Sequence, residues 1–265
     1  MVGQDNLLKL IDSFTIDTFP HSILLVGERG SGKHLICSYI KDKLNLPLTD
    51  ITNNIELDYI NEMYSRSFPS IYIVDLMAVK EKQQNILLKL VEEPLNNTFI
   101  ILLVENRGFV LPTILNRAIV LEVARYKKED LEKFITSDDK ESLLNIFHTP
   151  GQLMQAQITD LKGLQELCYK IVDKMSVAAY SNALTIANKI NYSNEMDKYD
   201  IYVFFDMLVH CLFERYKAST DKKILSIYKE TVKYRTQLLQ NPSLNKKCFM
   251  ENYLTQVWKM SREGK

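Results

Sequence analysis

Four short apolar runs, separated by segments with helical spacing, limit the fold of this chain more than any other feature of its sequence. Short apolar runs predict buried strands, and strands that alternate with helices favour a parallel sheet covered by helices on both faces. No comparable run follows Val123, and helical spacing takes over there. The sequence therefore predicts an α/β region followed by an all-α region. The predicted strands are Ser22–Val26, Ile71–Val74, Phe99–Val104 and Ala118–Val123.

The spacing of apolar residues also predicts the helices between and after these strands. Pro94 ends one of them, because proline disfavours the helical conformation of the residue before it. In the first half, helices are predicted at Asn6–Phe14, Lys33–Leu44, Leu57–Tyr64 and Gln83–Val91. In the second half, they are predicted at Lys127–Ile135, Lys140–Phe147, Pro150–Ile158, Leu161–Met175, Ala178–Ile190, Ile201–Tyr216, Lys222–Leu239 and Lys247–Met260.

Composition and cysteine spacing indicate the compartment of the protein and the kinds of partner it can bind. Lysine and arginine (33) equal aspartate and glutamate (33), so no global basic field indicates nucleic-acid binding, although a local patch stays open. The cysteines lie far apart without a CxxC pair, which favours reduced thiols and neither zinc nor disulfides. No run is long enough to span a membrane, and the polar start of the chain is not that of a signal peptide. We expect a cytoplasmic protein that does not bind membranes.

The segment after the first strand has the spacing of a phosphate-binding loop. Gly27, Gly30, Gly32 and Lys33 fit the pattern G-x-x-x-x-G-K. Such glycines let backbone N–H groups surround phosphate oxygens, while the following helix and the lysine supply positive charge. The residues predicted to form this degenerate nucleotide site are Gly27, Gly30, Ser31, Gly32, Lys33, His34 and Asp75.

Two positions depart from an active nucleotide hydrolase. His34 stands where serine or threonine normally holds Mg²⁺, and imidazole is a poor ligand for that cation. Leu76 follows Asp75 where a second acid would activate water. Hydrolysis at this site is therefore not expected. Whether the loop still binds ATP or ADP, or is only a strand-to-helix turn, stays open.

Several longer segments carry a resemblance to a known family. They are Gln84–Pro94 (QNILLKLVEEP), Leu111–Arg117 (LPTILNR) and Asn241–Asn245 (NPSLN). With the glycine loop, they resemble clamp-loader subunits of the AAA+ superfamily, most of all the delta-prime subunits of bacterial DNA polymerase III. The resemblance covers nearly the whole chain. It implies an AAA+ parallel-sheet core at 1–123, a three-helix lid at 124–158 and a C-terminal helical collar for oligomerisation at 159–265.

The resemblance also implies a function. Clamp loaders are rings of five related subunits that open a sliding clamp and place it on primed DNA, and their delta-prime member commonly does not hydrolyse ATP. It offers an arginine to the ATP of its neighbour, and Arg117 matches that residue, with Arg107 nearby as a decoy. The implied partners are the other subunits of a hetero-pentamer, the clamp and primer–template DNA. No cofactor is required, and no zinc is expected because the family's four-cysteine module is missing.

Two lysines are candidates for DNA contact. In the family, residues near the start of the helix after the aspartate strand follow DNA phosphates, and Lys80 and Lys82 hold that place. The alternative is a solvated charge cluster. In the lid, Gln152 follows Gly151 where relatives often have a nucleotide-sensing arginine.

Two other functions fit the same residues. The first is a self-sufficient AAA+ ATPase, such as a helicase loader or remodeller, in which another acid, with Glu105 as a candidate, replaces the missing one. The second is a structural adaptor that binds neither nucleotide nor DNA. ATP turnover by the pure chain would distinguish the first, and the absence of any nucleotide or DNA effect the second.

Overall fold

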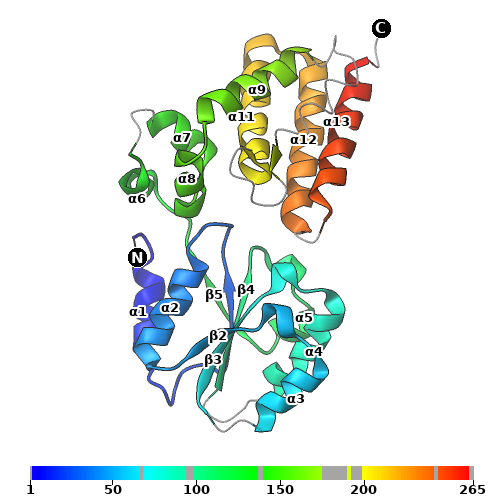
Figure 1. Ribbon diagram of the computed structural model, residues 1–265. Coiled ribbons are helices and arrows are strands. Elements are labelled where there is room, and N and C mark those ends of the chain that lie inside the picture. Colours follow the sequence, from blue (N-terminus) through cyan, green and yellow to red (C-terminus); the bar gives the residue numbers. More distant parts are fainter. Residues whose placement is uncertain are drawn as a thin grey trace. The chain divides into compact units, whose positions relative to one another are not determined.

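The chain folds into two compact units (Figure 1). The computed structural model describes residues 2–65, 68–93, 98–136, 140–174, 190–191, 199–241 and 244–262. One unit comprises Met1–Lys133 with Thr149–Gly151, and the other Phe134–His148 with Gln152–Lys265. Pro94, Pro242 and most of the predicted helix Ala178–Ile190 lie outside the described residues. The division into core, lid and collar stays a prediction.

The first unit is built on a parallel sheet of five strands in the order β2-β3-β4-β1-β5. The central strand β4 is buried along its whole length, as expected of a parallel sheet with both faces covered. The predicted α/β class with a parallel sheet is confirmed. The strands are β1 (Ser22–Val26), β2 (Leu48–Asp50), β3 (Ser70–Asp75), β4 (Thr98–Val104) and β5 (Ile119–Glu122).

Two apolar cores lie on opposite faces of this sheet, because successive side chains of a strand point to opposite sides. Leu24, Ile100 and Leu102 pack in one core, and Ile23 and Ile101 in the other. Helices α3 (Leu57–Ser65), α4 (Glu81–Glu92) and α5 (Pro112–Leu115) cover the first face, and α1 (Asp5–Ser13) and α2 (Lys33–Leu44) the second (Figure 1).

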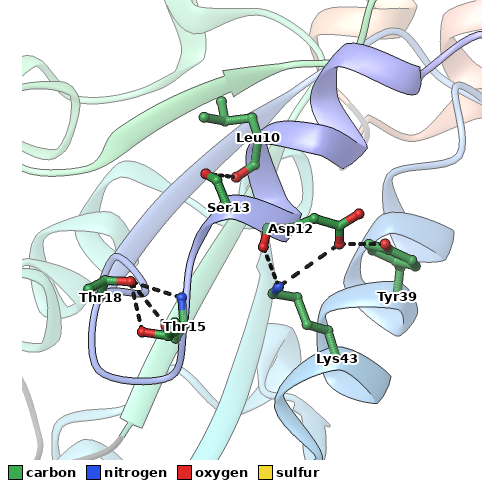
Figure 2. Close-up of polar contacts among 7 residues, drawn as sticks. All are labelled: Leu10, Asp12, Ser13, Thr15, Thr18, Tyr39 and Lys43. Carbon is green, nitrogen blue, oxygen red and sulfur yellow. Dashed lines mark hydrogen bonds and ion pairs between the residues drawn. The ribbon is translucent and has the colours of Figure 1, made fainter.

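Helix α2, which begins at the glycine loop, is fixed to α1 near its other end (Figure 2). The hydroxyl of Tyr39 donates to Asp12 Oδ1 at 2.6 Å, and Lys43 Nζ donates to the Asp12 carbonyl at 2.9 Å. The hydrogen bond to Asp12 raises the pKa of Tyr39. The Thr15–Thr18 turn then leads towards β1. Asp12 thereby fixes the direction in which α2 leaves the loop.

The second unit is helical, as the sequence predicts, and its buried residues include a cluster of aromatic side chains. Phe205 packs edge-on against Phe204 and Tyr253, and the hydroxyls of Tyr253 and Thr231 lie 2.8 Å apart. Burial raises the pKa of Tyr253. No helix in the described part of the chain has the length and apolar character that a bilayer crossing requires. The elements after β5 are α6 (Lys128–Leu131), a 3-10 turn (Glu132–Phe134), α7 (Lys140–Ile146), α8 (Pro150–Gln157), α9 (Leu161–Lys174), α11 (Ile201–Ser219), α12 (Lys222–Gln240) and α13 (Lys246–Arg262).

The prediction that no strand follows Val123 is wrong. Strands β6 (Ile190–Asn191) and β7 (Tyr199–Asp200) form a short parallel pair, so Ile190 is in a strand and not at the end of a helix. Asp200 caps α11 by accepting from the N–H groups of Tyr202 and Val203, which requires non-helical backbone just before that helix. A two-residue strand has too few positions to show any periodicity in the sequence.

Candidate functional site

The glycine loop, Asp75 and Glu105 meet at the carboxyl ends of three adjacent strands. The loop follows β1, Asp75 ends β3 and Glu105 follows β4. The Gly27 N–H donates to the Val104 carbonyl at 3.0 Å, which places Glu105 next to the first residue of the loop. In open parallel α/β sheets, ligands bind outside this edge. The predicted residues from Gly27 to His34 and Asp75 therefore come together, and Glu105 joins them.

The Lys33 ammonium group is bound by the loop itself. Its Nζ donates to the Gly27 carbonyl at 2.6 Å and to the Glu28 carbonyl at 3.1 Å. Burial lowers the pKa of Lys33, and the carboxylates of Glu105 and Asp75 oppose this shift. Burial likewise raises the pKa of Glu105 against the attraction of Lys33. The lysine and the two acids therefore form one half-buried charge cluster.

The glycines serve the geometry of the loop. Gly30 and Gly32 have φ of 76° and 88°, in the left-handed region that other residues avoid. A Cβ on Gly27 would lie 2.6 Å from Ser31 Oγ and 2.9 Å from the Val123 side chain. Ser31 is buried, and its hydroxyl has no hydrogen-bond partner within the described residues.

Three donors from later in the chain hold the loop from outside. The carbonyls of Arg29, Gly30 and Ser31 accept from Thr149 Oγ1 (2.9 Å), the Gly151 N–H (2.9 Å) and Tyr126 Oη (2.8 Å) respectively. A Cβ on Gly151 would lie only 2.6 Å from Gly30 Cα. We call Tyr126, Thr149 and Gly151 the carbonyl brace. Sequence reasoning missed the role of all three, because nothing local to them indicates a partner about a hundred residues away.

The residues present do not supply the ligands that a magnesium nucleotide ordinarily uses. His34 is exposed on the first turn of α2 and brings no hydroxyl. Asp75 Oδ1 accepts from the Met77 N–H at 3.0 Å, capping the 3-10 turn Leu76–Ala78. Leu76 is buried in the apolar core between the sheet and α4. Of the two departures seen in the sequence, Leu76 therefore has a structural role in the core. His34 is exposed and supplies no magnesium ligand.

Arg117 and the glycine loop lie at opposite ends of the parallel strands. It precedes β5, whereas the loop follows β1, and these two strands run parallel with Ile23 beside Ile119 and Val26 beside Glu122. The two ends are separated by about 10 Å of strand rise. Arg117 therefore does not reach the loop of its own chain.

The Arg117 side chain is held in place yet accessible. Its Nε pairs with Glu92 Oε1 at 3.1 Å, its Nη1 donates to the Thr113 carbonyl at 3.0 Å, and the side chain is 42% exposed. Arg107 instead pairs with Glu122 at 2.7 Å.

Gln84 links α4 to the segment that leads into α5. Its side-chain amide donates to the Phe109 carbonyl at 2.9 Å and accepts from the Leu111 N–H at 3.1 Å, although the residue is buried. The two helices that carry Glu92 and Thr113 are thereby joined by polar contacts.

The DNA-contact candidates are exposed at the start of α4. Lys80 is the N-cap residue, and its N–H donates to Gln83 Oε1 at 3.1 Å, while Lys82 lies in the first turn. They are on the helix that follows Asp75, as expected, but are not part of the Lys33 cluster. In the second unit, Gln152 Oε1 accepts from the His148 N–H at 2.9 Å.

Comparisons with known proteins found one family model that matches part of the first unit. Residues 50–127 match the family model described as DNA polymerase III, delta subunit. That segment includes Asp75, α4 and Arg117. No curated protein sequence matches the chain.

One solved structure shares the fold. A DNA polymerase III gamma subunit-related protein from Thermotoga maritima is 15% identical, with a TM-score of 0.51, over 97% of this chain and 99% of that chain. RuvB from the same organism is 15% identical, with a TM-score of 0.48, over 82% of this chain and 78% of its own. The gamma subunit-related protein shares with this chain its fold, a parallel-sheet core followed by a helical region. The family match covers residues 50–127, and the comparisons do not single out the delta-prime subunit.

Proposed function

We propose that this chain is a non-catalytic clamp-loader subunit of the delta-prime type in a DNA replication complex. It supports the ATP-dependent loading of a sliding clamp onto primed DNA and offers Arg117 to the ATP bound by a neighbouring subunit. The observation that carries the proposal is the position of Arg117, half exposed at the end of the strands opposite its own glycine loop. An arginine in that position is out of reach of its own loop and accessible to a site on another molecule.

The chemistry asked of Arg117 is electrostatic. A guanidinium group presents several N–H donors in a rigid fork, and charge that develops on a transferring phosphate is stabilised by such donors. The Nε contact with Glu92 and the Nη1 contact with Thr113 use two of the five N–H donors. The contacts fix the direction of the side chain before it meets the partner, which reduces the entropy lost on docking.

Partners follow from the same role. The helical region 159–265 joins the other subunits of a hetero-pentamer in the cytoplasm, and Lys80 and Lys82 contact phosphates of the primer–template DNA. Neither a cofactor nor zinc is needed by the chain itself.

The test is to reconstitute the chain with the ATPase subunits of the clamp loader from its own host and to measure phosphate release on primed DNA. Arg117→Ala should lower kcat by roughly 10³–10⁵-fold if it acts as arginine fingers do in GTPases. Arg107→Ala is the matched control and should leave kcat nearly unchanged, because that residue pairs with Glu122 in its own chain. Equal kcat for the wild type and Arg117→Ala in an assembled complex would refute the proposal.

One observation favours a second function, that of a self-sufficient ATPase. Glu105 follows β4 next to the start of the glycine loop, and burial raises its pKa, as a general base requires. Magnesium-dependent phosphate release by the isolated chain, lost in Glu105→Gln, would establish that function in place of the first.

A further inference from the structure

Negative charge from the chain's own acids already acts on Lys33, where a bound nucleotide would place a phosphate. Lysine has three N–H donors, and two of them are used by the carbonyls of Gly27 and Glu28. The carboxylates of Glu105 and Asp75 attract the same ammonium group electrostatically, and Glu105 has the larger effect. Its position follows from the backbone, because the Lys33 ammonium group binds the Gly27 carbonyl and the Gly27 N–H binds the carbonyl of Val104, the residue before Glu105. A terminal phosphate would therefore have to approach Lys33 next to an existing anion.

The backbone position of Glu105 is fixed next to the start of the loop. The hydrogen bond from the Gly27 N–H to the Val104 carbonyl fixes the backbone just before it, and β4 is the buried centre of the sheet. Asp75 is less suited to the same role, because its Oδ1 is engaged by the Met77 N–H. Glu105 is thus the anion that stands nearest in the sheet to the start of the loop and is not committed to a backbone cap.

We propose that Glu105 is a built-in competitor for nucleotide, whose carboxylate neutralises Lys33 and keeps ATP and ADP out of the glycine loop. The inference rests on the proposed function in treating the loop as non-catalytic, and it adds the residue that closes the loop to nucleotide. It differs from the loss of magnesium and water activation at His34 and Leu76, because it concerns binding and not hydrolysis.

The loop itself remains capable of receiving phosphate once that carboxylate is neutralised. The carbonyl brace holds its shape through Arg29, Gly30 and Ser31, and the first turn of α2 still offers backbone N–H groups. Glu105→Gln keeps the size of the side chain, so it changes the charge with little effect on packing. Affinity for ATP and ADP should rise by about 10–100-fold, as expected when a like charge is removed beside the binding group.

The experiment is a calorimetric titration of ATP and ADP into the full chain, once in magnesium and once in EDTA. The variants are wild type, Glu105→Gln, Glu141→Gln and the double variant Glu105→Gln/Lys33→Ala. Glu141 is an exposed acid on α7, and its charge is not among those that act on Lys33, so its substitution controls for a general change in charge. We expect weak binding by the wild type and by Glu141→Gln, a clear gain for Glu105→Gln, and loss of that gain in the double variant. Because His34 contributes no magnesium ligand, the gain should be similar in EDTA.

Three results would overturn the inference: equal affinities for wild type and Glu105→Gln, an equal gain for Glu141→Gln, or a gain that survives Lys33→Ala. Nucleotide hydrolysis by the wild type that Glu105→Gln abolishes would make the residue a base and also overturn it. None of these outcomes depends on Arg117, so the kcat test in the assembled complex decides the proposed function separately.

Discussion

Glu105 is a half-buried acid whose ionised form is less favourable in the folded chain than in water, because burial raises its pKa above the ordinary 4.5. An acid whose folded pKa is raised contributes stability below its unfolded pKa and loses that contribution as pH rises through the folded value. At pH 8 the wild type therefore carries a penalty that Glu105→Gln lacks.

We expect Glu105→Gln to be more stable than the wild type at pH 8, and the difference to shrink as the pH falls below about 4.5, where the carboxyl group becomes protonated in both states. Urea unfolding at several pH values measures this. A difference that does not change with pH, or a wild type that is the more stable at pH 8, would contradict the placement of Glu105 in a desolvated cluster.

The residue scale also shows what sequence reasoning can and cannot find. Gly27, Lys33 and Asp75 were predicted as one site, because a loop with this spacing and the end of a neighbouring buried strand must share an edge of the sheet. Tyr126 and Thr149 were not, because their hydrogen bonds to Ser31 and Arg29 depend on the completed fold.

At the scale of elements, α4 is joined to the segment before α5 by one buried side chain, Gln84. Replacement by leucine would leave the Phe109 carbonyl and the Leu111 N–H without that partner. Unpaired buried polar groups cost about 1–3 kcal/mol each. We therefore expect Gln84→Leu to lower the free energy of unfolding of the first unit by about 2–6 kcal/mol, as the sum of the two.

The neighbouring exposed residue provides the control for this measurement. Asn85 donates to the Glu81 carbonyl within α4, and Asn85→Ala should change stability by no more than about 0.5 kcal/mol. Chemical denaturation of both variants compares them directly. If Gln84→Leu and Asn85→Ala behaved alike, the hydrogen bonds of Gln84 would not link the two elements.

Most elements were predicted from the sequence because they are long enough to show periodicity. Helix α2 was predicted with the bounds that the structure has, as was strand β1. Strand β2 was missed because Leu48–Asp50 is short and only its first residue is apolar, as befits an edge. Helix α5 was missed because it is a single turn.

At the scale of the whole molecule, each compact unit has its own apolar core. Units of this kind often unfold separately. Scanning calorimetry should show two transitions, one for the sheet unit and one for the helical unit.

Two cavity-forming variants assign these transitions. Ile101→Ala should shift only the transition of the sheet unit and Phe204→Ala only that of the helical unit, since both side chains are fully buried in their cores. The losses should be about 2–5 kcal/mol, equivalent to a lowering of several degrees in Tm. A single transition shifted by either variant would mean that the units unfold as one.

The carbonyl brace has a consequence for how such a chain changes over generations. A loop that is ordered only by its bound ligand loses its shape when that ligand is no longer bound. Here three donors from distant parts of the polypeptide bind the carbonyls of Arg29, Gly30 and Ser31, and none of these hydrogen bonds involves a ligand. Because His34 is exposed and is not one of the residues that the brace holds, substitution there should leave the shape of the loop unchanged.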